Sequence, residues 1–116
     1  MSQKISILTL SFVASAALEA ERFVTAAGAY ATSAGNAGGV SATEAASGVL
    51  FAADVLGTAV VTAGAAVAKH AYVQVGTDGK AITQAAGIAV AQALEAAAAD
   101  GDSIEVLLIP NAPAGT

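Results

Sequence analysis

Few residues in this chain could do acid–base chemistry, and their spacing does not bring them together. His70 is the single histidine, and an imidazole acting as a general base needs a nucleophile and an orienting acid beside it. None of the serines lies in a Gly-x-Ser-x-Gly elbow, so the sequence indicates no nucleophile. We therefore expect His70 to lie on the surface or at the rim of a hairpin.

The carboxylates form two small groups that could bind or transfer protons. Glu19 and Glu21 flank the start of a possible strand at residues 22–24 and could act as a pair, but a solvated strand edge is the simpler interpretation. The run Asp100-Gly101-Asp102-Ser103 resembles part of a calcium loop. It lacks the further acids and the closing glutamate of an EF-hand, so we expect a turn that leads into a strand.

Cofactor motifs are not found either. The glycine cluster at residues 35–39 is not followed by the Lys-Ser/Thr of a phosphate loop, and no Gly-x-Gly-x-x-Gly opens a helix. The chain has no cysteine, which excludes disulfides, thiolate catalysis and zinc–thiolate sites. The sequence therefore predicts no catalytic, metal or cofactor site, and it gives no argument for an enzyme.

Composition predicts one small domain that gains from assembly. The 116 residues are 56% hydrophobic, but much of that share is alanine, which buries little area per residue. The net charge is −5, and the four cations are scattered singly, which argues against direct nucleic-acid binding. No apolar run reaches the 18 residues of a membrane span. Small-residue chains of this kind often gain stability by associating with others.

The elements that position these residues are expected to be short strands. Asp78-Gly79 between the alternating stretches of residues 72–83 predicts a tight hairpin turn. Residues 55–62 form a second strand candidate, with a bulge or bend at Gly57, and residues 103–109 form a third, which Pro110 ends.

Two further features of the chain are weaker. Residues 92–99 are rich in alanine and predict one short helix or helical turn. An internal echo pairs Gly39-Val40, Glu44 and the following Gly48 with Gly87-Ile88, Glu95 and Gly101, which would fit a small β-fold with pseudo-symmetry. In an alanine-rich chain such echoes arise easily.

The N-terminal stretch looks at first like a secretory signal peptide, because an apolar run follows Lys4. Ser6, Thr9 and Ser11 interrupt that run and alternate with apolar residues, which is typical of a strand. The phase of the alternation changes near residues 7–8, where a bulge or a change of partner is expected. We predict an uncleaved strand or arm, ordered by contact with another subunit or protein. The residues expected at its interface are Ile5, Ile7, Leu8, Leu10 and Phe12.

The ordered set of motifs resembles a known family. The motifs are Arg22-Phe23-Val24, Ala27-Gly28, Gly39-Val40-Ser41, Ala45-Ala46-Ser47-Gly48, Val55-Leu56-Gly57, Thr77-Asp78-Gly79-Lys80, Ala93-Leu94-Glu95 and Gly101-Asp102-Ser103-Ile104. In this order, over residues 5–109, the chain resembles the small tailed-phage capsid cement or decoration proteins of the DUF2190 type. Lys69-His70-Ala71 and the longer stretch at residues 88–92 depart from the family pattern.

The resemblance implies both a fold and a function. The expected fold is mainly β, a small β-tulip or barrel-like domain with an N-terminal arm at residues 1–18, a core at 19–109, a tail at 110–116 and one short helix or helical turn. The expected function is binding to the outer surface of a phage capsid, as a homotrimer whose partner is the major capsid protein. A neighbouring subunit or the capsid is then expected to order the N-terminal arm. The protein would be made in the host cytoplasm and would reside in the virion, without nucleic-acid or membrane contact.

Two rival interpretations remain open at this point. The signal-like start would suit an exported surface or adhesin-like β-domain, in which residues through about Ala16 are removed on export. A small ligand-binding or enzymatic domain would need a convergent polar pocket, with His70 as its first candidate.

Overall fold

The computed structural model describes residues 5–109, apart from the side chains of residues 6 and 7. The predicted tail at 110–116 therefore lies outside the described residues. The elements, in chain order, are β1 (Ser6–Val13), β2 (Phe23–Val24), β3 (Gly39–Ser41), β4 (Leu50–Thr62), β5 (Tyr72–Val75), the 3₁₀ turn η1 (Thr77–Gly79), β6 (Ala81–Thr83), β7 (Ala91–Ala93) and β8 (Ser103–Leu108).

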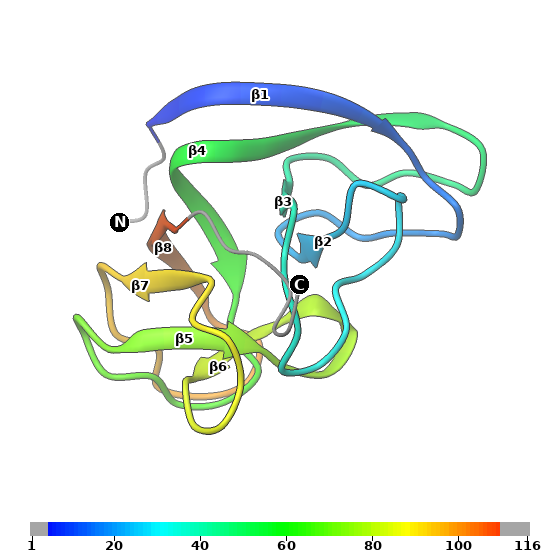
Figure 1. The fold of residues 1–116 in the computed structure, drawn as a ribbon. Coiled ribbons are helices and arrows are strands. Elements are labelled where there is room, and N and C mark those ends of the chain that lie inside the picture. The colour runs from blue at the N-terminus through cyan, green and yellow to red at the C-terminus, as the bar shows by residue number, and fades with distance from the viewer. Residues whose placement is uncertain (1–4, 110–116) are drawn as a thin grey trace.

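The strands form one strongly curved sheet, so the predicted mainly β, barrel-like fold is confirmed. The strand order is β2-β3-β4-β8-β7-β5-β6, with β1 paired to β4 outside this path, and the sheet is nearly closed on itself (Figure 1). The described neighbours pair antiparallel throughout. Many short strands with small side chains allow this tight curvature.

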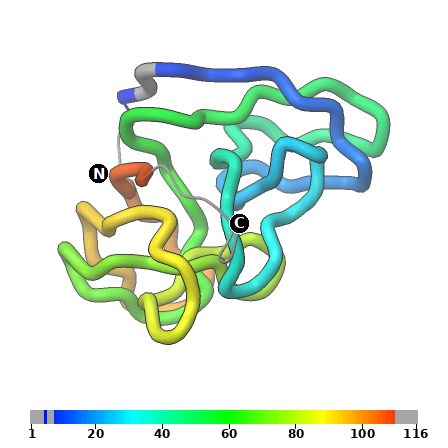
Figure 2. Tube along the Cα trace, in the orientation of Figure 1, coloured from blue at the N-terminus to red at the C-terminus, as the bar shows by residue number. Residues whose placement is uncertain are grey.

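Strand β4 connects the two parts of the molecule and bends at Gly57, as predicted. Its first half lies between β1 and β3, and its second half pairs with β8. Gly57 has a φ of 95°, a conformation that costs a glycine little and other residues more. Figure 2 shows β1 (blue) beside the first half of β4 (green), which then turns toward the strands drawn in yellow and orange. The strand begins at Leu50, whereas the sequence analysis predicted a start at residue 55.

The predicted hairpin is also confirmed. Strands β5 and β6 pair antiparallel, and the turn between them takes positive φ at Asp78 (55°) and Gly79 (73°). This connection is η1, the one helical turn among residues 5–109. A side chain at Gly79 would be strained and would also collide, since its Cβ would lie 2.5 Å from the Phe23 carbonyl oxygen.

The short helix expected at residues 92–99 is wrong. Its start belongs to β7, and Ala97 forms an isolated antiparallel bridge with Val67. The Ala93 and Ala97 N–H groups donate to the carbonyls of Ala71 and Val67, at 2.8 and 2.9 Å, so they are not available to a helix. Both alanines are buried in the larger core. Tertiary pairing therefore outweighs the helix propensity of alanine.

The N-terminal strand is confirmed, with one correction about what orders it. β1 pairs with β4, from Ser6 opposite Gly57 to Val13 opposite Leu50, and its register shifts on both sides of Leu8, where the bulge was expected. The partner strand thus belongs to the same chain, so neither a neighbouring subunit nor a capsid is needed to order β1. The alternation placed the strand correctly but carried no information about its partner.

The chain folds as two copies of one β unit, which share β4. We call residues 9–56 the first repeat and residues 58–109 the second repeat. The β1–β4 pairs Thr9–Asp54, Leu10–Ala53 and Phe12–Phe51 correspond to the β4–β8 pairs Thr58–Leu107, Ala59–Val106 and Val61–Ile104. Likewise, the β2–β3–β4 ladder corresponds to the β5–β7–β8 ladder.

Details outside the strands repeat as well. The Glu21 N–H donates to Ser41 at 2.7 Å, and the His70 N–H donates to Ala93 at 2.8 Å. Glu21 and His70 both have positive φ, 63° and 71°. The internal echo in the sequence was therefore meaningful, but its register was wrong in part: Gly48 does correspond to Gly101, whereas Gly39 corresponds to Ala91.

The two repeats pack so that the sheet of the first has a core on each face. Phe23 and Val40 belong to the larger core. They pack there with Ala59, Val61 and Val106, which lie on what we call the inner face of the second repeat. Val24 and Phe51 point to the other face and belong to a smaller core beneath β1. The first repeat is thus covered on one face by the second repeat.

Candidate interaction surfaces

An apolar strip lies on the β1–β4 ribbon. Leu8 and Leu10 of β1 are 41% and 43% exposed, and Leu56, which pairs with Leu8, is 38% exposed. Further along the same face Phe51 is buried. We call Leu8, Leu10 and Leu56 the arm face. It is a continuation of the smaller core that residues 5–109 leave uncovered.

The other predicted arm residues have different surroundings. Ile5 is 67% exposed, and its N–H donates to Thr58 Oγ1 at 2.6 Å. Phe12 is half-buried, with its ring edge-on to Phe51 at a centroid distance of 6.0 Å. The side chain of Ile7 lies outside the described part. Phe12 thus anchors β1 on the body, whereas Ile5, Leu8 and Leu10 are free to meet a partner.

A second surface crosses the outer face of the second repeat. Tyr72 pairs with Gln92, Gln92 with Leu107, and Leu107 with Thr58, so the four side chains form one row across β5, β7, β8 and β4. Tyr72 is 51% exposed and Leu107 is 41% exposed. We call these four residues the cross-sheet row. The sequence analysis missed it because its members come from four separate strands, and only pairing brings them into line.

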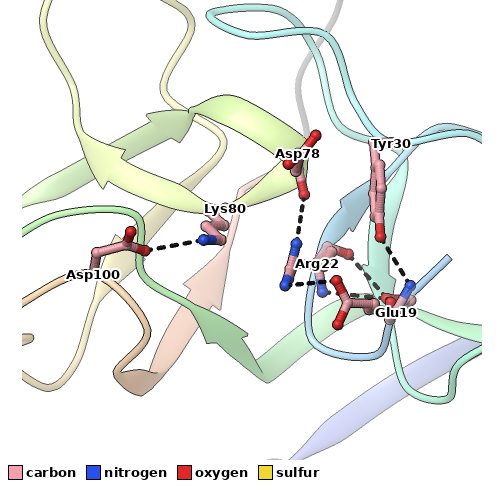
Figure 3. A network of polar contacts seen from close by, with 7 residues as sticks. Glu19, Arg22, Tyr30, Asp78, Lys80 and Asp100 are labelled. Carbon is pink, nitrogen blue, oxygen red and sulfur yellow. Dashed lines mark hydrogen bonds and ion pairs between the residues drawn. The ribbon is translucent and has the colours of Figure 1, made fainter.

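Arg22 joins the two repeats near the start of β2 (Figure 3). Its guanidinium donates to Glu19 Oε2 at 3.0 Å and to the Asp78 carbonyl oxygen in η1 at 3.1 Å. It also lies 5.9 Å from the centre of the Tyr30 ring, whose hydroxyl accepts the Glu19 N–H. The arrangement holds the η1 turn against the first repeat, which is a structural role.

The predicted carboxylate pair is not assembled as acid and base. Glu19 binds Arg22, while Glu21 Oε1 accepts a hydrogen bond from Ser103 at 2.8 Å. Asp100 pairs with Lys80 at 3.0 Å, also visible in Figure 3. These contacts hold turns against strands, and each of the three carboxylates is bound to a side chain of the same protein.

The remaining polar candidates also act within turns. His70 is exposed, and its carbonyl accepts from Gln92 Nε2 at 3.1 Å. Asp102 Oδ2 accepts the N–H groups of Ala98 and Ala99, which confirms the turn expected before β8. Within residues 5–109 no three His, Cys, Asp or Glu residues are grouped so that they could hold a metal ion.

A shallow groove lies beside the arm. Its lining is mostly apolar, with Leu18 and Val49 among its residues and with Glu19 and Glu44 as its acids. The Tyr30 ring also lines it. No convergent set of polar groups lies in this groove, so it lacks the features of a substrate pocket.

Comparison with known families identifies the chain. A family model described as "Phage cement protein" matches residues 1–108, nearly the whole sequence. The chain belongs to the phage cement protein family. The resemblance seen in the motifs is thereby confirmed, and the protein is a structural, virion-associated protein of a phage.

Comparison with solved structures supports the fold. The crystal structure of the head fiber gp8.5 N base of bacteriophage phi29 superposes with a TM-score of 0.71. The match covers 88% of this cement protein and 93% of that chain, at 17% sequence identity. No curated protein matches the sequence. Among residues 5–109, no helix is long and apolar enough to cross a membrane.

Proposed function

We propose that this cement protein binds the outer surface of a phage capsid and stabilises the expanded shell, with the major capsid protein as its partner. In this proposal it acts as a homotrimer, is made in the host cytoplasm and has no enzymatic activity. It touches neither nucleic acid nor a membrane directly. Membership of the phage cement protein family is the observation that carries the proposal.

The physical role would be to add interface area between capsid subunits. A shell under pressure from packaged DNA opens only if neighbouring subunits separate, and a protein that bridges them adds contacts that must break first. Many copies of a modest interface act together at high effective concentration. The net charge of −5 suits an outer position, since it repels the phosphates of packaged DNA.

We place the contact with the capsid protein, or with a neighbouring copy, on the predicted arm. Its residues are Ile5, Ile7, Leu8, Leu10 and Phe12. Among the described strands β1 pairs only with β4, which leaves its second edge open to a further strand. Two of the exposed leucines of the arm face, Leu8 and Leu10, lie on the same strand. Phe12 would contribute by holding β1 in place.

Binding to shells tests the proposal directly. The purified full-length protein is mixed with expanded shells and with unexpanded precursor shells that both lack it, and bound protein is measured by co-sedimentation and cryo-electron microscopy. We expect saturable binding to expanded shells, with density on their outer surface. Absence of binding to expanded shells, or density on the inner surface, would refute the proposal.

The arm is tested by substitution, because deleting residues 2–11 would also remove the partner strand of β4. We expect Leu8→Glu with Leu10→Glu to lose shell binding, since two charges would be buried without partners. The matched control is Val49→Glu with Leu50→Glu, at positions that are 50% and 65% exposed outside the arm face. Shell binding by the first variant at the level of the control would show that the arm is not the contact.

The alternative function, an exported surface domain, predicts a different product. The intact mass of the protein recovered from infected cells would then lack the residues through about Ala16. We expect instead that the mass includes β1.

A further inference from the structure

The two repeats differ in what covers their outer faces. The cross-sheet row of the second repeat, Tyr72, Gln92, Leu107 and Thr58, has an equivalent in the first repeat. The equivalent residues, in the same order, are Phe23, Val40, Asp54 and Thr9. The same strand pairings therefore produce the same row twice in one molecule.

Three members of the first row are buried, while Thr9 at its end is exposed; in the second row Tyr72 and Leu107 are exposed and the other two members are half-buried. Phe23, Val40 and Asp54 are 0%, 1% and 2% exposed, whereas Tyr72 and Leu107 are 51% and 41% exposed. The apolar members of the first row, Phe23 and Val40, pack into the larger core. That core is formed chiefly by the inner face of the second repeat, so one repeat docks its outer row onto the inner face of the other.

The inner faces differ in exposure in the opposite direction: that of the second repeat is buried, and that of the first is partly exposed. In the second repeat, Ala59 and Val61 of β4 are fully buried by this docking. Their equivalents in the first repeat are Leu10 and Phe12, and Leu10 is 43% exposed. Leu10 of the arm face therefore lies on the inner face of the first repeat, where Ala53 and Phe51 are buried in the smaller core and Leu10 has no outer row docked onto it.

We propose that copies of this protein associate head to tail, with the cross-sheet row of one copy docked against the arm face of the next. The contact would reproduce between chains the packing that joins the two repeats within a chain. Among the described residues, each copy carries one outer row and one stretch of inner face that no repeat of the same chain covers. Val13, Val49 and Leu50 are exposed as well, but the repeat gives them no complementary surface. The proposal rests on the self-association included in the proposed function and names its surfaces.

The net charge of the protein favours a second copy of the chain as the partner that covers these two surfaces. Copies with a net charge of −5 repel one another, and a contact between two uncharged surfaces adds least to this repulsion. The cross-sheet row and the arm face contain no charged residue. The row also replaces the buried Asp54 with Leu107 at the equivalent position, which removes the charge where the next chain would dock.

Such a contact uses two different patches, and this has a consequence for assembly. Heterologous contacts close into a ring when the rotation between copies allows it, and otherwise continue as a filament. A closed ring of three chains would be the homotrimer of the proposed function. It would contain six repeats, each with its outer row docked on the next.

The test uses two single variants in solution, without shells. Leu107→Glu blocks the cross-sheet row, and Leu10→Glu blocks the arm face. We expect sedimentation velocity to show oligomers of the unsubstituted protein, and each variant alone to associate about a hundredfold more weakly or not at all. Leu50→Glu, at a site that is 65% exposed outside both surfaces, is the control and should assemble normally.

Mixing the two variants gives the sharpest readout. Each retains the surface that the other has lost, so an equimolar mixture should form a one-to-one heterodimer and go no further. A mixture that stays monomeric, an unsubstituted protein that stays monomeric, or variants that assemble like the control would each overturn the proposal. Circular dichroism of each variant establishes that it is folded. Because shells are not used, failure here would leave capsid binding by the monomer standing.

Discussion

At the scale of single residues, the molecule depends on close backbone approach more than on polar chemistry. Arg22 and Gly79 lie at the same junction, where the η1 turn of the second repeat meets β2. Arg22 binds the Asp78 carbonyl, and Gly79 allows the turn to contact the Phe23 carbonyl. The polar groups that looked capable of chemistry hold turns in place, which is consistent with a structural protein.

Gly79→Ala should destabilise the fold by about 3 kcal/mol. Positive φ alone costs an alanine about 1 kcal/mol, and the new Cβ would also lie 2.5 Å from a carbonyl oxygen that cannot easily move. Gly48→Ala is the matched control, because Gly48 has a φ of 86° but a Cβ added there would meet no atom within 4 Å. Urea unfolding followed by far-UV circular dichroism measures both. Equal losses of stability would contradict the steric argument.

At the scale of elements, β1 has two functions on one face. Phe12 packs edge-on against Phe51 and closes the smaller core, while Leu8 and Leu10 extend beyond that core. The bulge at Leu8 lies in the exposed part of the strand, before the packed residue Phe12. The strand is thus attached at one end and presents apolar surface at the other.

Phe12→Ala should therefore cost about 2 kcal/mol of folding stability, less than the 3–5 kcal/mol typical of a fully buried phenylalanine. Leu8→Ala, on the same strand and face, should cost less than about 1 kcal/mol because the side chain is 41% exposed. Both unfolding free energies are measured at low protein concentration, where association does not contribute. A larger loss for Leu8→Ala would mean that the arm face is covered within the monomer.

At the scale of the whole molecule, the internal repeat explains why the cross-sheet row and the arm face are both apolar and exposed. Two units that dock in sequence always leave one inner face and one outer row unused. In a longer array of repeats, terminal units cover such faces with polar residues. Here Leu10 and Leu107 remain apolar and exposed, which suits a protein that works as one member of an assembly.

Association should also make thermal stability depend on concentration. Each tenfold increase in protein concentration should raise the Tm of the unsubstituted protein by at most about 5 °C, because binding between folded copies stabilises them by mass action. The Tm of Leu107→Glu should stay constant over the same range. Differential scanning calorimetry at several concentrations measures both, and parallel behaviour of the two proteins would argue against the contact.

Local patterns were sufficient for several elements. Alternation placed β1, β8 and the β5–β6 hairpin, because period two and turn-forming pairs such as Asp78-Gly79 act through neighbouring residues alone. Local patterns failed at residues 92–99, where alanine propensity favoured a helix and pairing with β5 and β8 produced strand β7. They also located the arm without its partner β4, since the two strands are far apart in the sequence.

The sequence by itself thus determined the β class, the absence of a chemical motif and, through the order of small-residue motifs, the family. Only the tertiary structure decided which strands meet, that the chain is a shared-strand repeat, and that Leu107 and Tyr72 lie in one row with Gln92 between them. The physical reason is that exposure depends on non-local packing. Phe23 and Tyr72 occupy equivalent positions in the two repeats, and one is buried only because the second repeat lies over it.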